Sequence, residues 1–539
     1  MTNTKIFFIG ISYLLLFGLS FIPNLWIFFG ELIFIRWTSI IFFVLHIFYI
    51  YKFKSFLPRI DSTLRLKLTT VSLLVLGIIF FITFPIRNLA LGDGILLIEN
   101  IILETLAFQY SVVPDELLEG FAHSLLYKFL LPYTQNPMIS YRILSTFIGI
   151  VLLTIFNFIY SKSKNVGIIL LLFFSSGGSL LYYGYTENYV LVSLTIFLTL
   201  LYGYKTISVE SNSNKQILTI AFLGALSAVT HLISGFLLFA LVYYCFCISN
   251  PNHKKIFGEN FLKLFNIQLF KNILVAGIVS SMVIFPIYIY YIYFSDLQID
   301  LSLAHASHPP FLPIKKIFSL GHLKDLGLEA IFVGFTSILS IIYFYIFQRD
   351  EFKIIIEEKQ FQFLMLSFLG FFLHFLTYNP LLGYPADWDL MGFIWIPLFL
   401  LNVHLLKNNP KPYIELIPLY FYCWIFITYT ALNLSKKNQE EEKIKFLVES
   451  IQEYLPTFKN IEPTLENKYK KTYIHTDYFL FRTNKKLKSM DEPSLLQESD
   501  ALITEFKKQN LLVDKEKWKK FIQRATEFHI NYLQKTEQQ

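Results

Sequence analysis

Apolar residues follow one another along most of this chain in runs of about twenty, separated by short polar or basic segments. A helix needs about 20 apolar residues to cross the hydrocarbon core of a bilayer. The pattern therefore predicts an all-α polytopic membrane protein with about 13 transmembrane helices. We expect these helices at residues 6–29, 32–51, 68–86, 139–160, 166–183, 189–204, 217–229, 232–248, 273–294, 328–347, 361–378, 390–406 and 414–434.

Two apolar regions are too long for one helix, and polar residues indicate where each region divides. Residues 166–204 contain the sequence GYTENY, and residues 217–248 contain Thr230 and His231 near their middle. Because each region exceeds the roughly 20 residues that one span needs, we expect two helices in each region and a break at the polar site.

Basic residues indicate which segments lie inside the cell. Residues 52–67 carry five lysines and arginines against one aspartate, and the positive-inside rule assigns such a segment to the cytoplasm. The N-terminus is then cytoplasmic as well, and the next polar segment lies outside. With an odd number of spans, the C-terminal segment also lies outside.

The chain divides by composition into two units. Residues 1–434 form the expected transmembrane core, with outer loops at 87–138, 295–326 and 379–389. Residues 435–539 are rich in charges of both signs, and their apolar residues follow a helical spacing. This pattern predicts a small soluble helical domain outside the membrane.

The first outer loop begins with a strongly acidic stretch. Its acidic residues are Asp93, which lies between two glycines, and then Glu99, Glu104, Asp115, Glu116 and Glu119. Acidic residues directly after a membrane span are costly to bury, so they indicate a functional site. We expect two short amphipathic helices here, at 95–110 and 114–131, and both should lie along the membrane interface because they are too short and too acidic to span.

Composition supports a membrane protein and excludes other classes. Hydrophobic residues make up 54% of the chain and charged residues 16%. The net charge of +7 is spread over the loops, which is typical of topology control, so we expect membrane lipids as partners and no nucleic acid. Cys245, Cys247 and Cys423 all lie in apolar runs and indicate neither a disulfide framework nor a metal site.

Polar residues at the ends of the expected spans converge on the outer side. Besides the acidic stretch they are Arg142, Glu187, Asn188, Thr230, His231, His305, His308, His322, Asp387 and Asp389. A random scatter of such residues would divide between the two faces. The convergence therefore predicts one reaction or binding chamber at the outer leaflet.

Several of these segments resemble the C-type (GT-C) glycosyltransferase superfamily. The resemblance is carried by LGDG at 91–94, DELLEGFAHSLLYKFL at 115–130 and SYRILSTFIGI at 140–150, and it extends over residues 65–250. GYTENYVL, the pair Thr230 and His231, and DWDL at 387–390 also resemble a poorly characterised bacterial branch of these enzymes. The resemblance implies an enzyme of the bacterial inner membrane that transfers a sugar from a polyprenyl-phosphate donor to a lipid, glycan or protein acceptor on the outer face.

The resemblance also implies a catalytic residue. Asp93 falls at the catalytic acidic position of the superfamily, and Gly94 stands where a second acidic residue usually follows. Inverting transfer from a lipid phosphate needs a carboxylate that takes the proton of the acceptor hydroxyl, so we expect Asp93 to be the base. A helix-capping role for Asp93 is the alternative.

The remaining site residues follow from the same chemistry. The leaving phosphate gains charge that cations stabilise, and the candidates for this role are Arg87, Arg142, His231, His305 and His308. The candidates for acceptor binding or an accessory role are Asp115, Glu116, Glu187 and Asn188. Asp387 and Asp389 have a spacing that suits a divalent metal ion, but the sequence leaves metal dependence and oligomeric state open.

Two other function classes fit a chain of this kind. A transporter or flippase for a lipid-linked or envelope substrate predicts discontinuous helices and ionisable groups near mid-membrane. A non-catalytic assembly protein would depend mainly on the soluble C-terminal unit. The charged residues of this chain lie at span ends, which favours the enzyme.

Overall fold

The computed structural model describes residues 2–19, 32–52, 63–87, 116–134, 136–160, 165–209, 213–250, 266–294, 310–380, 387–435 and 493–507, together with residues 92, 94, 97–98, 101, 163, 520, 524 and 527–528. Within these residues the chain is helical and contains no β-strand, only one antiparallel bridge between Phe311 and Tyr378. The all-α fold expected from the hydrophobic pattern is confirmed.

Helices lie at the positions of the expected spans. They are α1 (Thr2–Leu19), α2 (Leu32–Lys52), α3 (Thr63–Thr83), α6 (Met138–Tyr160), α7 (Val166–Phe174) with the 3₁₀-helix η4 (Gly177–Tyr182), α8 (Val190–Thr206), α9 (Ser213–Thr230), the 3₁₀-helix η5 (Leu232–Leu237) with α10 (Leu238–Ser249), α11 (Ile267–Phe294), α14 (Leu320–Phe347), α16 (Lys359–Thr377), α18 (Trp395–Asn408) and α20 (Ile417–Leu434). In the described residues, seven helical stretches are long and apolar enough to cross a membrane by length and composition. The chain is a multi-pass membrane protein, and thirteen crossings stay a prediction.

Shorter helices lie between these segments or, for α24, after them. They are α5 (Leu117–Leu130), α13 (Ile314–Ile317), α15 (Arg349–Ile355), α17 (Trp388–Met391), the 3₁₀-helix η7 (Gly392–Ile394), α19 (Lys411–Glu415) and α24 (Pro493–Lys507). Of the expected C-terminal unit, the structure describes α24 and a few single residues, so its extent as a domain stays a prediction.

One helix begins earlier than the expected span that it covers. The expected outer loop 295–326 was to precede a span at 328–347, but α13 and the first residues of α14 already lie within this loop. Helix α14 begins early because the Ser319 side chain accepts a hydrogen bond from the His322 backbone N–H and so caps the helix. The expected breaks inside the long apolar regions are confirmed: α9 ends at Thr230 before η5, and η4 ends at Tyr182 before α8.

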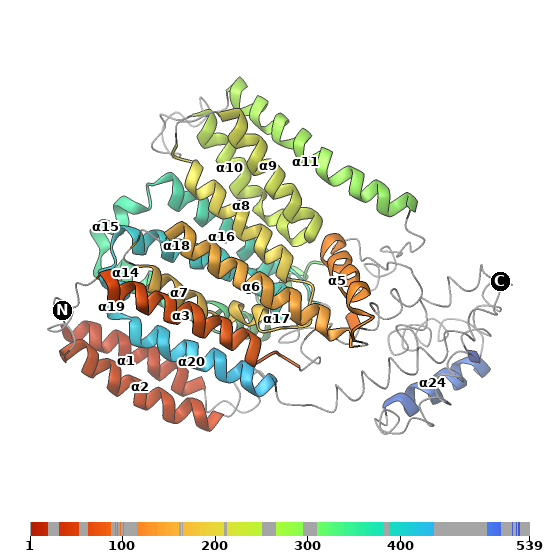
Figure 1. The fold of residues 1–539 in the computed structure, drawn as a ribbon, viewed down its shortest axis with the longest axis horizontal. Helices are drawn as coiled ribbons and strands as arrows, with labels where there is room; N and C mark the ends of the chain where they lie inside the picture. The colour runs from red at the N-terminus through yellow and green to blue at the C-terminus, as the bar shows by residue number, and fades with distance from the viewer. Residues whose placement is uncertain are drawn as a thin grey trace.

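The helices form a bundle whose order in space differs from their order in the chain (Figure 1). On one side α1 packs against α2, α2 against α20, and α20 against α7. On the other side α8 packs against α9, and α9 against α11. Helix α5 lies at the end of the bundle where α3 and α20 end and α8 begins (Figure 1). We call this the α5 end.

The core of the bundle is helix α18. All its residues from Trp395 to Leu406 are buried, because this segment is apolar except for Asn402 and His404 and contacts α14, α16 and α8. Phe173 and Phe197 pack edge-on against Trp395. A Cβ atom at Gly178 would collide with the Trp395 indole, so glycine lets η4 pack closely against α18.

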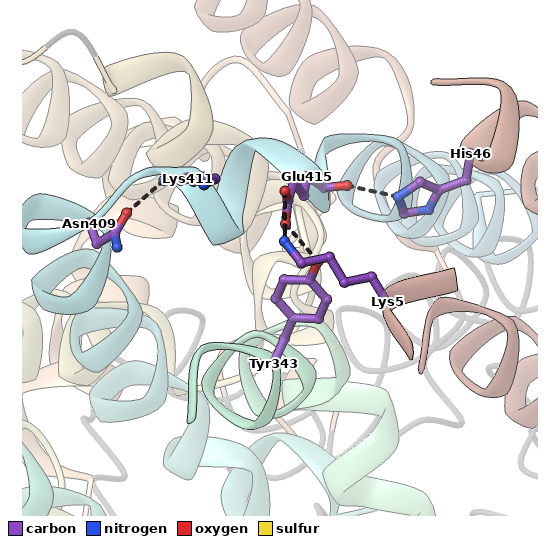
Figure 2. Close-up of polar contacts among 6 residues, drawn as sticks. All are labelled: Lys5, His46, Tyr343, Asn409, Lys411 and Glu415. Carbon is purple, nitrogen blue, oxygen red and sulfur yellow. Dashed lines mark hydrogen bonds and ion pairs between the residues drawn. The ribbon is translucent and has the colours of Figure 1, made fainter. Parts of the chain in front are cut away.

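A polar cluster joins helix α1 to α19, the short helix just before α20 (Figure 2). The ammonium group of Lys5 in α1 donates to both carboxylate oxygens of Glu415 in α19, at 2.8 and 2.6 Å. The Tyr343 hydroxyl donates to the same carboxylate at 2.7 Å, and the His46 ring lies 2.8 Å from the Glu415 carbonyl oxygen. The cluster thus ties α1, α2, α14 and α19 together at the end of α20 opposite the α5 end.

Candidate functional site at the α5 end

Most of the candidate residues lie in the described part of the chain. Asp93, Asp115, His305 and His308 lie outside the described residues, so their roles stay predictions. Arg87, Arg142, Glu116, Glu187, Asn188, His231, Asp387 and Asp389 are described.

The connection between η4 and α8 is one part of the candidate site. This connection carries GYTENY, and its Gly184 has a positive φ of 67°, which glycine adopts without the strain of a side chain. A Cβ atom at Gly184 would lie 3.2 Å from Cγ of Arg142 and 3.1 Å from Cβ of Pro85, so this turn packs against the start of α6 and the end of α3. The backbone N–H of Ile86 donates to the Tyr183 carbonyl at 2.7 Å, which fixes the same junction.

Glu116, directly before α5, contacts two residues from other parts of the chain. The Asn188 amide donates to Oε2 of Glu116 at 2.8 Å, and Nε2 of His231 lies 3.4 Å from Oε1. The Glu116 side chain is 15% exposed and that of His231 is 7% exposed. The structure therefore brings together three residues that come from the first loop, the GYTENY connection and the break after α9.

The backbone fixes the protonation pattern of His231. The Ile233 N–H donates to Nδ1 of His231 at 3.0 Å, so Nδ1 acts as an acceptor. In the neutral ring the proton is then on Nε2, which faces the Glu116 carboxylate. Since both ring nitrogens are engaged, the geometry favours a role of His231 in orienting Glu116 over contact with a phosphate, and the phosphate role is a prediction that no contact here supports.

Glu119 binds the beginning of α8. Its Oε1 accepts from the Leu191 N–H at 2.8 Å and its Oε2 from the Val192 N–H at 3.0 Å. The Glu119 side chain is fully buried, and burial raises its pKa to about 8, with the nearby Glu116 adding to the rise and the two backbone donors and His231 opposing it. The two N–H donors at the N-terminus of α8 stabilise the ionised carboxylate and so limit this rise.

His123 lies one turn further along α5. Its Nε2 is 4.0 Å from Oε1 of Glu119, and its ring stacks on Tyr141 of α6 with centroids 3.8 Å apart. Burial lowers the pKa of His123 to about 3, so the ring is neutral near pH 7. The buried side of α5 is thus a polar stripe of Glu119, His123 and Tyr127 at intervals of four residues.

The LGDG segment contacts the GYTENY connection through Gly92. Gly92 has a φ of 119°, and a Cβ atom there would collide with Oε1 of Glu187 and lie 3.1 Å from the Tyr185 hydroxyl. The Glu187 side chain is buried. The residue before Asp93 in the sequence therefore lies directly beside a buried carboxylate.

Tyr185 joins this region to the DWDL segment. The Trp388 indole N–H donates to the Tyr185 hydroxyl at 3.3 Å. Burial raises the pKa of Tyr185 well above its usual value, and the charges of Asp389 and Glu187 and a hydrogen bond with Asp389 add to the rise. Tyr185 therefore stays protonated, and its hydroxyl joins the GYTENY connection to the DWDL segment.

A further buried carboxylate lies behind DWDL. Glu329 of α14 is fully buried, and neither of its oxygens has a hydrogen-bond partner among the described residues. Asp387 and Asp389 are close enough to act on it electrostatically. In the described residues no group of three or more histidine, cysteine or acidic side chains has a geometry that could hold a metal ion, so a metal role of Asp387 and Asp389 stays a prediction.

The two arginines lie at helix ends. The Arg87 backbone N–H donates to the carbonyl of Leu434 at 2.9 Å, which joins the start of the first loop to the end of α20. The Arg142 guanidinium lies 3.7 Å from the Met138 sulfur, and its stem packs beside Gly184. Both side chains are half-buried.

Sequence reasoning gave no specific role to four residues of this site. Glu119 lies in the acidic stretch and Tyr185 in GYTENY, so both segments were recognised. The partner of Glu119 follows only from the packing of α5 on α8, and that of Tyr185 only from the packing of DWDL on GYTENY. Trp388 lies between two noted aspartates. Glu329 carried a signal that could have been used, because it is an acidic residue inside a span.

The sequence matches no protein-family model and no curated protein at a significant level. Two crystal structures of ArnT from Cupriavidus metallidurans share a distant likeness of fold. The structure bound to undecaprenyl phosphate has a TM-score of 0.41 and 9% identity and covers 87% of this chain and 78% of that chain; the apo structure has a TM-score of 0.40 and 10% identity, covering 86% and 76%. At these values the likeness is too distant to say what this chain binds.

Proposed function

We propose that this chain is a membrane glycosyltransferase that moves a sugar from a polyprenyl-phosphate-linked donor to a lipid, glycan or protein acceptor. The observation that carries the proposal is the meeting of LGDG, GYTENY and DWDL at the α5 end, where Gly92 lies beside Glu187 and Tyr185 bridges to Trp388. These are the segments that resemble GT-C enzymes, and they come from three separate parts of the chain.

The proposed reaction is a displacement at the sugar. Asp93, the next residue after Gly92, takes the proton of the acceptor hydroxyl. The acceptor oxygen then bonds to the anomeric carbon, the bond from that carbon to the phosphate oxygen breaks, and polyprenyl phosphate leaves with the electron pair. Arg142 and Arg87 stabilise the charge of the leaving phosphate.

Glu116 and Asn188 are proposed to bind the acceptor. The Glu116 carboxylate is partly exposed and already oriented by the Asn188 amide and the Nε2–H of His231. A carboxylate held by two donors presents its remaining lone pairs in a fixed direction, which suits hydrogen bonding to sugar or lipid hydroxyl groups.

This function requires the α5 end to face the outside of the bacterial inner membrane, with the N-terminus in the cytoplasm and residues after 434 outside. The basic segment 52–67 supports this orientation.

Replacing Asp93 tests the proposed function. Asp93→Asn keeps the size of the side chain and removes its basicity, so transfer should fall by about 10²- to 10⁴-fold with donor binding nearly unchanged. The assay measures transfer from a polyprenyl-phosphate sugar in proteoliposomes, and donor binding separately. The control Glu99→Gln removes a charge from the same loop and should retain activity. Full activity of Asp93→Asn would eliminate this residue as the base.

Arg142→Ala, in contrast, should weaken donor binding, because a cation beside the phosphate acts in the ground state as well as in the transition state. Unchanged donor affinity in this variant would contradict the phosphate role of Arg142.

A transporter for a lipid-linked substrate is the second candidate. Among the described helices three are interrupted, at η4, η5 and η7, and the fully buried Glu329 lies within a membrane-length helix. Interrupted helices and buried ionisable groups are features of transporter sites. Movement of a labelled polyprenyl-phosphate sugar across proteoliposomes without any sugar transfer would favour this candidate over the enzyme.

A further inference from the structure

Helix α8 begins without a cap of its own. Its N-cap residue, Tyr189, makes no side-chain hydrogen bond to the helix. The first N–H groups of a helix have no partner inside the helix, and leaving them unpaired in a buried place is costly. In this chain the partner of two of these N–H groups is Glu119, which lies 72 residues before Leu191 and 73 before Val192.

The contact is specific for glutamate. Each oxygen of Glu119 accepts one N–H of α8, so both oxygens are needed as acceptors. Glutamine would place an NH₂ group against one of these N–H donors, and aspartate is shorter by one methylene group. Because the Glu119 side chain is fully buried, water cannot replace the lost acceptor.

The start of α5 also contacts the segment directly before α8. Glu116 lies three residues before Glu119 and accepts from the side chain of Asn188, which immediately precedes Tyr189. Positions three apart share one face of a helix or its first turn. The start of α5 therefore makes two contacts here, one with the backbone of α8 at Leu191 and Val192 and one with the side chain of Asn188 just before α8.

We propose that Glu119 is a positioning residue that holds the first turn of α8 against α5 and thereby sets the arrangement of Glu116, Asn188 and His231. This inference rests on the proposed function, in which that arrangement binds the acceptor. Glu119 itself does not touch a substrate: its two oxygens are used by the backbone of α8.

Hydrogen exchange measures the positioning without any substrate. In Glu119→Gln, the amides of Leu191 and Val192 and the amides of segment 184–189 should exchange faster than in the wild type. The full-length protein in nanodiscs provides the sample. If exchange in this region is unchanged, Glu119 does not hold the connection and the inference is overturned.

Kinetics then distinguish positioning from simple stabilisation. Glu119→Gln should raise the KM for the acceptor about tenfold, with donor binding unchanged. The matched control is Glu415→Gln, which also removes a hydrogen-bonded carboxylate but at the opposite end of the bundle; it should lower the unfolding temperature and leave the acceptor KM unchanged.

Two outcomes separate this inference from the proposed function. Faster exchange in Glu119→Gln combined with an unchanged acceptor KM would show that Glu119 is only a helix cap, and would overturn the inference while the enzyme stands. A wild-type protein that transfers no sugar would overturn the proposed function, and the exchange data would then decide whether Glu119 holds the 184–189 connection.

Discussion

Glu116 and Glu119 are three residues apart, yet their carboxylates have different surroundings. Glu116 is partly exposed and contacts the side chains of Asn188 and His231, whereas Glu119 is fully buried and accepts only backbone N–H groups. A partly exposed carboxylate can exchange a protein partner for a substrate hydroxyl. A buried carboxylate with both oxygens used cannot, so it acts on structure.

Gly92 provides the sharpest test at the residue scale. Gly92→Ala adds a Cβ atom that collides with the Glu187 carboxylate at a φ of 119°, a backbone conformation costing about 1–3 kcal/mol for a residue with a side chain. Because the neighbouring Asp93 is the proposed base, transfer should fall about 10²-fold, while the unfolding temperature of the bundle changes little.

The control for this prediction is Gly120→Ala. A Cβ atom there has no atom within 4 Å, and alanine in a helix is about 1 kcal/mol more favourable than glycine. Gly120→Ala should therefore be as active as the wild type and equally or more stable. Wild-type transfer rates in Gly92→Ala would show that this close approach is not needed for catalysis.

The residue types of the site could be found from the sequence, but their partners could not. Acidic residues next to membrane spans are rare enough to attract attention, which is why Glu116, Glu187 and Asp389 were candidates. The contact of Glu119 with Val192 joins positions 73 apart and depends on how α5 packs on α8. No local spacing contains that information.

Helix α5 turns its polar side toward the interior of the bundle. Glu119, His123 and Tyr127 are buried, whereas Phe121, Leu125 and Phe129 are 41%, 50% and 69% exposed. An apolar stripe with a spacing of four residues on the outer side of a helix is costly in water and favourable in lipid. We therefore interpret α5 as a helix that lies on the membrane surface with this stripe in the lipid.

Spin labels can measure this orientation. Labels at Phe121→Cys, Leu125→Cys and Phe129→Cys should be accessible to oxygen, which concentrates in the bilayer, and protected from a water-soluble nickel complex. A label at Lys128→Cys, which is also exposed but charged in the wild type, serves as the control and should show the opposite preference. Equal nickel accessibility at all four positions would contradict the lipid contact.

Elements were easier to predict than their ends. The apolar runs predicted helices at the correct places because a membrane span must be helical and about 20 residues long. Ends were less certain since they depend on capping: Ser319 starts α14 eight residues earlier than the apolar run alone indicates. The break before η5 was predicted correctly because Thr230 and His231 interrupt an apolar region.

At the scale of the whole molecule, one polar cluster joins residues from the beginning and the end of the transmembrane core sequence. Lys5 and Glu415 form an ion pair whose side chains are 10% and 15% exposed, with Tyr343 as a third member (Figure 2). Lys5 also lies over the rings of Tyr343 and Phe347, at 5.9 and 5.5 Å from their centroids. This cluster attaches the hairpin of α1 and α2 to the remaining helices.

Lys5→Ala should destabilise the protein by about 2 kcal/mol, because it leaves a mostly buried carboxylate without its charged donor. Thermal unfolding in detergent measures the effect. Lys411→Ala removes an exposed lysine from the same helix as Glu415 and should have little effect. If both variants unfold at the wild-type temperature, the ion pair does not hold the hairpin.

The global arrangement was the part least accessible from the sequence. The positions of the helices follow from hydrophobicity, but the order in which α2, α20 and α7 pack does not, because any apolar helix can contact any other in a membrane. Only specific groups, such as Lys5 with Glu415, select one arrangement, and their pairing across 410 positions leaves no local pattern. The C-terminal unit after residue 434 stays a prediction.

The pair of Lys5 and Glu415 also has a consequence for biosynthesis. A ribosome adds about 5–20 residues per second, so Lys5 is made about 20–80 s before its partner, 410 residues later. During that time α1 and α2 are present in or at the membrane while the carboxylate that neutralises Lys5 does not yet exist. The hairpin can therefore reach its final position only when nearly the whole core has been synthesised, and a chain released before Glu415 would keep Lys5 without this partner.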